Sequence, residues 1–239
     1  AEIDRRAYGL MLPMMFDSYD EWDHVRQEIN PILEANLKEK GFIVLAWTDL
    51  GWVYFFTKEP MRTPADLVGM KLAASHSETE TIDIFKWAGF NPVPISFVDM
   101  MTGFQTGLID STYAPVILAE GSQFYRQVSN MTDLKWAPLQ GAVVMHEKGW
   151  NQLSPGQQKE MLRITRQVGE ELRLSNREQE QRSLDAMTKR GLEIVKISDA
   201  VLSQWRETVE KAYPRVRENL VTPEIFDRVL RLCNEFRAR

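Results

Sequence analysis

The sequence predicts an α/β fold of alternating strands and helices, and the stretch from Pro60 to Pro115 carries the prediction. Three short apolar segments in this stretch are predicted to be strands: Met70–Ala74, Pro92–Ile95 and Asp110–Ala114. Each is bounded by Pro, Gly or Ser, and two segments with helical spacing of apolar residues separate them. Strands that alternate with helices in this way are typical of a parallel α/β layer.

A layer of this kind also predicts where a ligand would bind. Ligands collect beyond the carboxyl ends of parallel strands, next to the N-termini of the helices that follow. In this sequence the strand ends are Ala73–Ser75, Ile95–Phe97 and Tyr113–Pro115. We therefore expect a small-molecule site to draw residues from all three.

A long helix is predicted near the N-terminus. Ser18-x-x-Glu21 has the form of a capping box, and apolar residues then recur at helical spacing as far as Gly41, which ends the helix. Pro31 is expected to kink or restart this helix, because proline cannot donate a helical hydrogen bond. The apolar segment before the helix, Tyr8–Phe16, is predicted to be a strand or a loop.

Two buried strands follow in the prediction, Phe42–Trp47 and Trp52–Thr57, with a turn at Asp49–Gly51 between them. Thr63-Pro64-x-Asp66 then predicts a single helical turn, with Thr as the cap and Pro at the first helical position. The remaining helices of this half are expected at Ser77–Ala88, Phe97–Leu108 and Pro115–Tyr125.

One long polar helix dominates the second half. The capping box Ser154-Pro155-x-Gln157 predicts its start, and it runs to about Arg190, a length on the order of 54 Å. Such a helix exceeds a single small domain, so we expect it to span two lobes; the alternative is a surface helix kinked near Gly169. Further elements are predicted as strands at Gly141–His146 and Leu192–Ile197, and as helices at Ser198–Tyr213 and Thr222–Phe236.

The composition is that of an ordinary globular protein of one large or two small domains. A net charge of −5 gives no electrostatic case for nucleic acid or an anionic membrane. The single Cys233 excludes an internal disulfide bond. No apolar run is long enough for a membrane span, and no signal peptide is visible, which fits a cytosolic chain or a processed or truncated exported one.

No motif for catalysis or metal binding stands out. The three histidines, His24, His76 and His146, lie on separate predicted elements, and a lone Cys removes any thiolate zinc site. The sequence has no P-loop, no dinucleotide fingerprint and no nucleophile elbow. We therefore predict no catalytic residue, no metal and no cofactor.

The aromatic residues are more informative. Seven Trp is a high number, and four of them fall at turns or strand ends, namely Trp47, Trp52, Trp136 and Trp150. Aromatic side chains in such places either wall a ligand pocket or pack in a core.

The motifs between Pro60 and Asp110 resemble a known family. In chain order they are Pro60-x-Arg62-Thr-Pro-x-Asp66-Leu-x-Gly69-x-Lys71-Leu, then Gly89-Phe-Asn-Pro-x-Pro94-Ile, Phe97 and Gln105-Thr-Gly107-x-Ile109-Asp110. Together they resemble the periplasmic solute-binding proteins of TRAP transporters, the DctP-type receptors. Weaker similarity extends toward both ends of the chain.

The resemblance implies a type 2 periplasmic-binding-protein fold. In that fold two α/β lobes, joined by hinge strands and a long helix, close on a ligand. The implied lobe I comprises residues 1–50 and 140–180, and lobe II residues 51–139 and 181–239. The implied function is periplasmic and not enzymatic: the receptor captures a small organic solute, usually an organic acid, and delivers it to the TRAP membrane subunits. A homodimer is left open.

The sequence departs from the family pattern in two ways. It starts after the expected N-terminal strand–helix–strand unit. Two explanations are left open: the chain is a fragment, or a partner or altered packing covers the place of the missing strands. The family typically carries an Arg, which pairs with the ligand carboxylate, where this chain has Ala73, and frequently an Asn where it has Ala114. With both polar anchors replaced by methyl groups, we expect a less acidic or bulkier, partly apolar ligand.

The expected ligand-binding residues are Trp52, Ala73, Ser75, Phe97, Tyr113, Ala114 and Gln140. Phe97 would stack on the ligand, Ser75, Tyr113 and Gln140 would offer hydrogen bonds, and the two alanines would set the pocket volume. A rival expectation is that Arg62 replaces the missing anchor, although it lies on the turn before the strand.

Two other function classes are left open. One is a divergent relative that acts as a scaffold or interaction protein without transporting a ligand. The other is an enzyme on the same lobes, whose sign would be His146 beside an acid and a Ser in the cleft.

Overall fold

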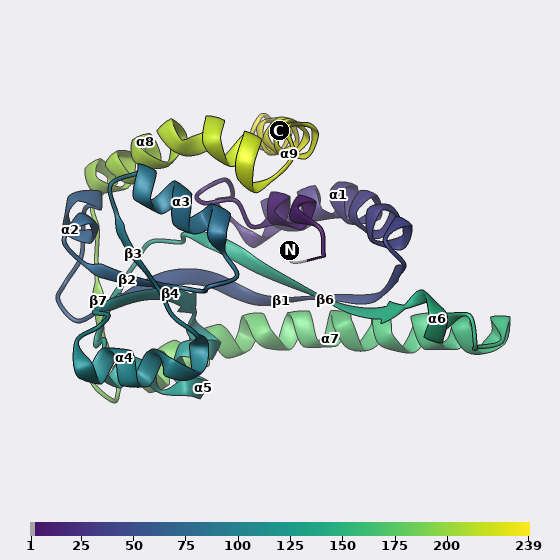
Figure 1. Cartoon of the computed structure of the whole chain (residues 1–239), viewed down its shortest axis with the longest axis horizontal. Coiled ribbons are helices and arrows are strands. Elements are labelled where there is room, and N and C mark those ends of the chain that lie inside the picture. The colour runs from purple at the N-terminus through teal and green to yellow at the C-terminus, as the bar shows by residue number, and fades with distance from the viewer. Residues whose placement is uncertain (1–2) are drawn as a thin grey trace. The chain divides into compact units, whose positions relative to one another are not determined.

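The computed structural model describes residues 3–239 and divides the chain into two compact units (Figure 1). Unit 1 takes the described residues up to Gly51, then Pro138–Gln179 and Val221–Arg239. Unit 2 takes Trp52–Ala137 and Glu180–Leu220. The sequence places the lobe boundaries close to these, except that it assigns the last segment to lobe II.

The elements of unit 1 come from three parts of the chain. They are the 3-10 helix η1 (Arg5–Leu10), α1 (Tyr19–Glu39), the first ten residues of β1 (Phe42–Thr57), most of β6 (Ala137–His146), α6 (Glu147–Trp150), most of α7 (Pro155–Thr188) and α9 (Pro223–Arg237). β6 pairs with β1. The sequence prediction of a strand or loop over Tyr8–Phe16 misses η1, whose N-cap Asp4 accepts a hydrogen bond from the backbone N–H of Arg6.

Helix α1 begins and ends close to the predicted positions, but it is not interrupted at Pro31. The Ser18 hydroxyl accepts a hydrogen bond from the backbone N–H of Glu21, and the helix runs unbroken through Pro31. One face of it is buried, with residues at helical spacing: Trp22, Val25, Ile29, Leu33 and Leu37. Packing of this apolar face compensates for the helical hydrogen bond that is lost because Pro31 has no backbone N–H.

Helix α9 explains why the last segment belongs to unit 1. Its buried face packs against α1 and η1, and consists of Ile225, Phe226, Val229, Leu232 and Cys233. A Cβ atom at Gly9 of η1 would come within 2.4 Å of Ile225 Cγ2, so only glycine allows this approach.

The prediction of a turn at Asp49–Gly51 is wrong, because these residues lie within β1, a single strand of sixteen residues. Asp-Leu-Gly has the composition of a turn, but Asp49 is fully buried and its carboxylate lies 2.9 Å from the Arg177 guanidinium. The Asn176 amide also donates to the Asp49 backbone oxygen. Partners far away in the sequence therefore hold this stretch extended, and Gly51 adopts a φ of 91° within it.

Helix α7 is continuous from Pro155 to Thr188, as predicted for a single long helix, and it has no break at Gly169, where the alternative places a kink. A Cβ atom at Gly169 would meet Ala46 Cβ and the Trp47 carbonyl oxygen at 2.9 Å each. Glycine here lets the helix lie directly on β1. None of the helices among residues 3–239 is long and apolar enough to cross a bilayer.

Unit 2 contains the parallel α/β layer that the sequence predicts. Its strands are ordered β3-β2-β4-β1-β5-β7. Their bounds are Asn91–Pro94 for β3, Lys71–Ala74 for β2, Ser111–Pro115 for β4, Asn130–Thr132 for β5 and Glu193–Val195 for β7, with β1 taking part through residues 53–57. β2 is parallel to β3 and β4, which confirms the prediction; β1 is antiparallel to β4 and β5, and β7 is parallel to β5.

Helices cover both faces of this sheet (Figure 1). α3 (Thr79–Trp87) and α8 (Asp199–Arg215) lie on one side, and α4 (Met100–Thr106) and α5 (Val116–Ser122) on the other. A short helix, α2 (Pro64–Val68), carries the predicted Thr63–Asp66 capping box. α5 ends earlier than predicted because Gln123 adopts a left-handed conformation, with φ 58°, and the 3-10 helix η3 (Phe124–Arg126) follows.

The core of unit 2 is aromatic on both faces. Successive residues of β1 point to opposite faces, so Phe55 and Phe56 start two separate clusters. The α3/α8 face joins Phe55, Phe85, Phe90, Tyr113, Trp136 and Trp205 through ring contacts of 4.9–6.4 Å. The other face joins Phe56, Phe104 and Phe124. Aromatic packing, rather than a pocket wall, is the role of Trp136.

Candidate functional site

The predicted binding edge of unit 2 lies where β2, β3 and β4 end. Residues of β2 and β3 are paired in register from Lys71 with Asn91 to Ala74 with Pro94, and Leu72 pairs with Ser111 of β4. The three strands are parallel, so their carboxyl ends meet at one edge of the sheet.

The register also determines which side chains share a face. Leu72 and Ser111 are paired, and side chains alternate along each strand. Ala73 of β2 and Ala114 of β4 therefore point to the α4/α5 face. Tyr113 points to the opposite face, toward its antiparallel partner Phe55 on β1.

Tyr113 is held by α3 and its N-terminus. Its ring lies 5.5 Å from the Phe85 ring in an edge-to-face arrangement. Its hydroxyl donates a hydrogen bond of 2.5 Å to the Glu78 carboxylate, at the start of α3. Sequence reasoning assigns this hydroxyl to a ligand and misses Glu78; the signal was an acidic residue at the N-terminus of a helix that follows a strand.

The two alanines expected at the positions of the family anchors are buried. Ala73 is 3% exposed and Ala114 is 5% exposed. Val93 of β3 and Thr112 of β4 share their face by the same register. This part of the edge presents methyl groups and no charged side chain.

The loops that follow β2 and β3 are open to solvent. Phe97 begins the 3-10 helix η2 (Phe97–Asp99) and is 51% exposed, and Val98 beside it is 84% exposed. After β2, the hydroxyls of Ser75 and Ser77 are 3.1 Å apart. The edge therefore has an apolar rim after β3 and a hydroxyl-rich rim after β2, both able to contact a solute.

Trp52 lies on β1 in unit 2, and Gln140 lies on β6 in unit 1. Trp52 is 1% exposed in β1, and the Lys135 ammonium lies 5.2 Å from its ring centroid. Gln140 belongs to unit 1, where its amide nitrogen donates to Asn30. The structure thus gathers Ala73, Ser75, Phe97, Tyr113 and Ala114 at one edge of unit 2, and places Gln140 in the other unit.

Acidic residues outnumber basic ones in the segment that contains the three strand ends. Between Leu72 and Tyr125 the chain has six Asp and Glu residues and, of Lys and Arg, only Lys86. Arg62, the rival anchor, precedes α2, and its backbone N–H donates to Asp66 while its carbonyl accepts from the Trp205 indole. Residues 72–125 therefore offer no guanidinium to a carboxylate.

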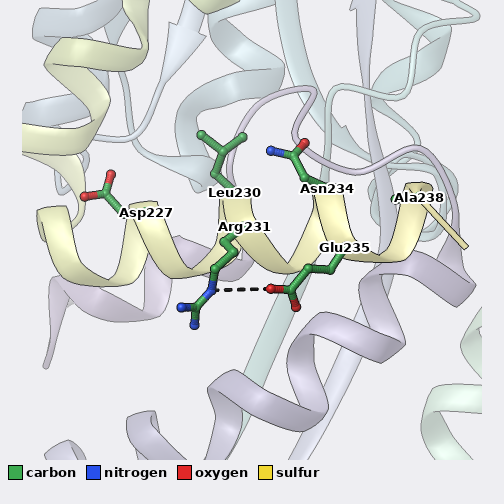
Figure 2. Close-up of a pocket in the computed structure, with 6 residues that line it drawn as sticks. All are labelled: Asp227, Leu230, Arg231, Asn234, Glu235 and Ala238. Carbon is green, nitrogen blue, oxygen red and sulfur yellow. Dashed lines mark ion pairs between the residues drawn. The ribbon is translucent and has the colours of Figure 1, made fainter.

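Two surface hollows lie in unit 1. Neither is lined by a predicted ligand-binding residue, but Asn30, the hydrogen-bond partner of Gln140, lines one of them. One, of about 560 Å³, follows the outer face of α9 (Figure 2) and is lined by Asp227, Leu230, Arg231, Asn234, Glu235 and Ala238. Arg231 and Glu235 form an ion pair of 3.7 Å along it. The other, of about 270 Å³, lies between α1, β1 and α7 and is lined in part by Arg26, Trp47 and Arg166.

Within residues 3–239 no cluster of His, Cys, Asp and Glu could hold a metal ion.

Comparison with known proteins identifies relatives over most of the chain. The model of the DctP family, described as bacterial extracellular solute-binding protein, family 7, matches residues 2–219. The 2,3-diketo-L-gulonate-binding periplasmic protein of Escherichia coli is 30% identical over 192 residues, which are 77% of this chain and 58% of that protein. The sialic acid-binding periplasmic protein of Vibrio cholerae is 21% identical over 223 residues, covering 91% of this chain and 67% of its own length.

Solved structures show the same fold. A TRAP periplasmic solute-binding protein from Ralstonia eutropha, with bound (S)-2-acetolactate, gives a TM-score of 0.87 at 20% identity and covers 97% of this chain and 76% of its own. One from Xanthobacter autotrophicus, with bound β-D-galacturonate, gives 0.86 at 20% identity with the same coverage. These neighbours confirm the fold class predicted from sequence. The chain spans little more than half the length of the first relative it matches.

Proposed function

Because this chain belongs to the DctP family of bacterial extracellular solute-binding proteins, family 7, we propose that it is the solute receptor of a TRAP-type transporter. It would capture a small organic molecule in the periplasm and deliver it to the membrane subunits. The observation that carries the proposal is the family match over residues 2–219. The family is one of binding proteins and not of enzymes.

The relatives support a small polar solute. Their names assign them 2,3-diketo-L-gulonate, sialic acid, C4-dicarboxylates and ectoine. Solved neighbours hold acetolactate, galacturonate, glucuronate, succinate and galactonate. Most of these are carboxylates, which bind best to a bidentate guanidinium.

We propose that the solute of this chain is less acidic, or bulkier and more apolar, than those carboxylates. Ala73 and Ala114 share a face at the binding edge, and neither can hydrogen-bond a carboxylate. Residues 72–125 contain no Arg and a single Lys, Lys86. The exposed Phe97 and Val98 would contact an apolar part of the solute.

The identity of the solute can be tested directly. Native mass spectrometry of the purified protein should show a co-purifying molecule whose removal lowers the thermal midpoint. A thermal-shift panel should then favour uncharged or zwitterionic compounds, such as ectoine, over galacturonate and succinate. A strong shift with the acids and none with the other compounds would contradict the proposed ligand class.

The panel also tests the alternative of a scaffold. A scaffold would respond to none of the solutes and would instead bind a protein. If the purified chain carries no solute, shows no shift with any compound and forms a stable protein complex, the receptor function is wrong.

We also propose that the receptor forms a homodimer. The part of α7 that belongs to unit 1 exposes an apolar stripe of Ile164, Val168 and Leu172, each about half exposed. A second copy could cover this stripe. Sedimentation equilibrium should then show a dimer for the wild type and a monomer for Val168→Glu. A monomeric wild type would contradict the proposed homodimer.

A further inference from the structure

A cluster of buried charges holds three elements of unit 1 together. It consists of Asp23 and Arg26 on α1, Asp49 on β1, and Arg173 and Arg177 on α7. The three guanidinium side chains are only 11–14% exposed, and the Asp49 side chain is fully buried. We call these five residues the charge cluster.

Arg177 is the centre of the charge cluster. Its two terminal nitrogens donate to both carboxylate oxygens of Asp23, at 2.8 and 2.7 Å, which is the bidentate geometry. One of them also donates to Asp49 Oδ2 at 2.9 Å. The guanidinium carbon lies 4.0 Å from the centroid of the Tyr19 ring. One side chain of α7 thus binds α1 and β1 at once.

Burial disfavours the charges of the cluster, and the ion pairs outweigh it only in part. Burial opposes the charge of Asp23 and of Arg177, but their mutual ion pair prevails, so that the pKa of Asp23 is lowered and that of Arg177 is raised; the Glu170 carboxylate raises the pKa of Arg173. For Asp49 and Arg26 burial prevails. Burial raises the pKa of Asp49, although Arg177 and Arg26 oppose it. Burial also lowers the pKa of Arg26, against the attraction of Asp23. The Asp49 Oδ1 atom is buried with no hydrogen-bond partner among the described residues. Apolar side chains of similar size would often be as stable in such a place, so stability alone does not explain the charge cluster.

The position of the charge cluster in the chain offers an explanation. β1 and α7 both continue from unit 1 into unit 2. Asp49 lies two residues before Gly51, the last unit 1 residue of β1, and Arg177 lies two residues before Gln179, the last of α7. The ion pair therefore joins the two segments just before each leaves unit 1. The Asn176 amide adds a second bond to the Asp49 backbone oxygen at 2.7 Å.

We propose that the charge cluster is a clamp: it locks the unit 1 ends of β1 and α7 to α1, so that the two segments leave unit 1 as one rigid body. Ionic partners suit this role because they fix direction as well as distance, whereas apolar contacts allow sliding. The proposal concerns the connections between the units, and it does not depend on which solute the protein binds.

The test compares variants that open the clamp with one that does not. Arg177→Met removes the central guanidinium, and Asp49→Asn keeps the shape of the side chain while removing its charge. The control is Arg163→Met, because Arg163 and Glu160 form an exposed ion pair of 2.7 Å on the same helix. Nitroxide labels on cysteines introduced at the exposed positions Gln152, in unit 1, and Ala200, in unit 2, report the distance between the units.

Double electron–electron resonance should give a broader distance distribution in both clamp variants than in the wild type and in Arg163→Met. Hydrogen exchange of the amides at residues 47–51 and 175–179 should become roughly tenfold faster in the clamp variants. A charge cluster that only stabilises unit 1 would lower the unfolding midpoint and leave the distribution unchanged, which would overturn the proposal. If Arg177→Met fails to fold, Asp49→Asn decides between the two outcomes.

Discussion

Ala73 and Ala114 lie on adjacent parallel strands with their methyl groups on the same face of the unit 2 sheet. Longer side chains at these two positions would therefore point into one shared volume. This relationship follows from the pairing of Leu72 with Ser111 and from the alternation of side chains along a strand. We therefore propose Ala73 as the position at which a substitution changes ligand preference most directly.

Ala73→Arg should create affinity for a carboxylate such as D-galacturonate. A charge-assisted hydrogen bond contributes about 1.5–3 kcal/mol, so binding should tighten by about 10-fold or more. Isothermal titration calorimetry measures it. Ala73→Met is the matched control, since it adds length without charge. Equal binding by the two variants would show that position 73 does not face the solute.

Tyr113→Phe tests whether the hydroxyl serves the fold. Its hydrogen bond to the Glu78 carboxylate should contribute about 1.5–3 kcal/mol to the free energy of unfolding. Glu78→Gln should cost a similar amount, and the double variant should cost less than the sum because both changes remove one interaction. Urea unfolding of the four proteins completes the cycle. Additive effects would mean that Tyr113 and Glu78 act separately, and the hydroxyl would remain a candidate ligand contact.

The sequence predicts the local parts of this fold well. The three parallel strands of unit 2 and most helix starts depend on signals a few residues apart, such as the Thr63–Asp66 capping box. The errors arise where the local conformation depends on a residue that is distant in the sequence. Asp49–Gly51 has turn composition, but Arg177 holds it in a strand from 128 positions away.

The candidate site shows the same division. The strand ends that form its edge follow from the alternation of strands and helices. Alternation along the predicted strand separates Tyr113 from Ala114. Which of the two shares a face with Ala73 depends on the register between β2 and β4, which the sequence alone does not supply. Burial of Trp52 and Trp136 is likewise set by packing, which aromatic content does not reveal.

Gly169→Ala should destabilise the protein, because the added methyl group would meet Ala46 Cβ and the Trp47 carbonyl oxygen at 2.9 Å. Overpacking of this kind costs about 1–3 kcal/mol. Gly156→Ala, in the first turn of the same helix, is the control, since nothing lies within 4 Å of its new Cβ. It should be neutral or stabilising by up to about 1 kcal/mol. Urea unfolding midpoints that rise for both variants would contradict the close packing of α7 on β1.

Cys233 should be inert in the folded protein. Its side chain is fully buried on α9, and burial raises the pKa of the thiol to about 12, with the Glu21 carboxylate acting in the same direction. Since the thiolate is the reactive form, a thiol reagent at pH 8 should label the native protein negligibly and the urea-unfolded protein fully. Rapid labelling of the native protein, with its far-UV circular dichroism unchanged, would contradict the burial of this residue.

Asp4 should make stability depend on acid pH. The Arg6 guanidinium, which donates to the carboxylate from Nε at 2.9 Å, holds the pKa of Asp4 well below its usual range; burial opposes this, while the Arg6 backbone N–H and the Lys40 ammonium reinforce it. A carboxyl group whose folded pKa is depressed contributes stability above its unfolded pKa of about 3.9, and the contribution is lost as pH falls toward the folded value.

Asp4→Asn keeps an oxygen that can cap η1 and removes the charge. The variant should lose about 1.5–3 kcal/mol of unfolding free energy at pH 7. The gap to the wild type should hold down to about pH 5 and narrow below about pH 4, because the wild-type carboxylate then binds a proton on unfolding. Urea unfolding from pH 7 to pH 3 measures it. Asp133→Asn, which removes an exposed partner of Lys196, should show a small gap at every pH; an equally small gap for Asp4→Asn would mean that the Asp4–Arg6 pair adds little to the fold.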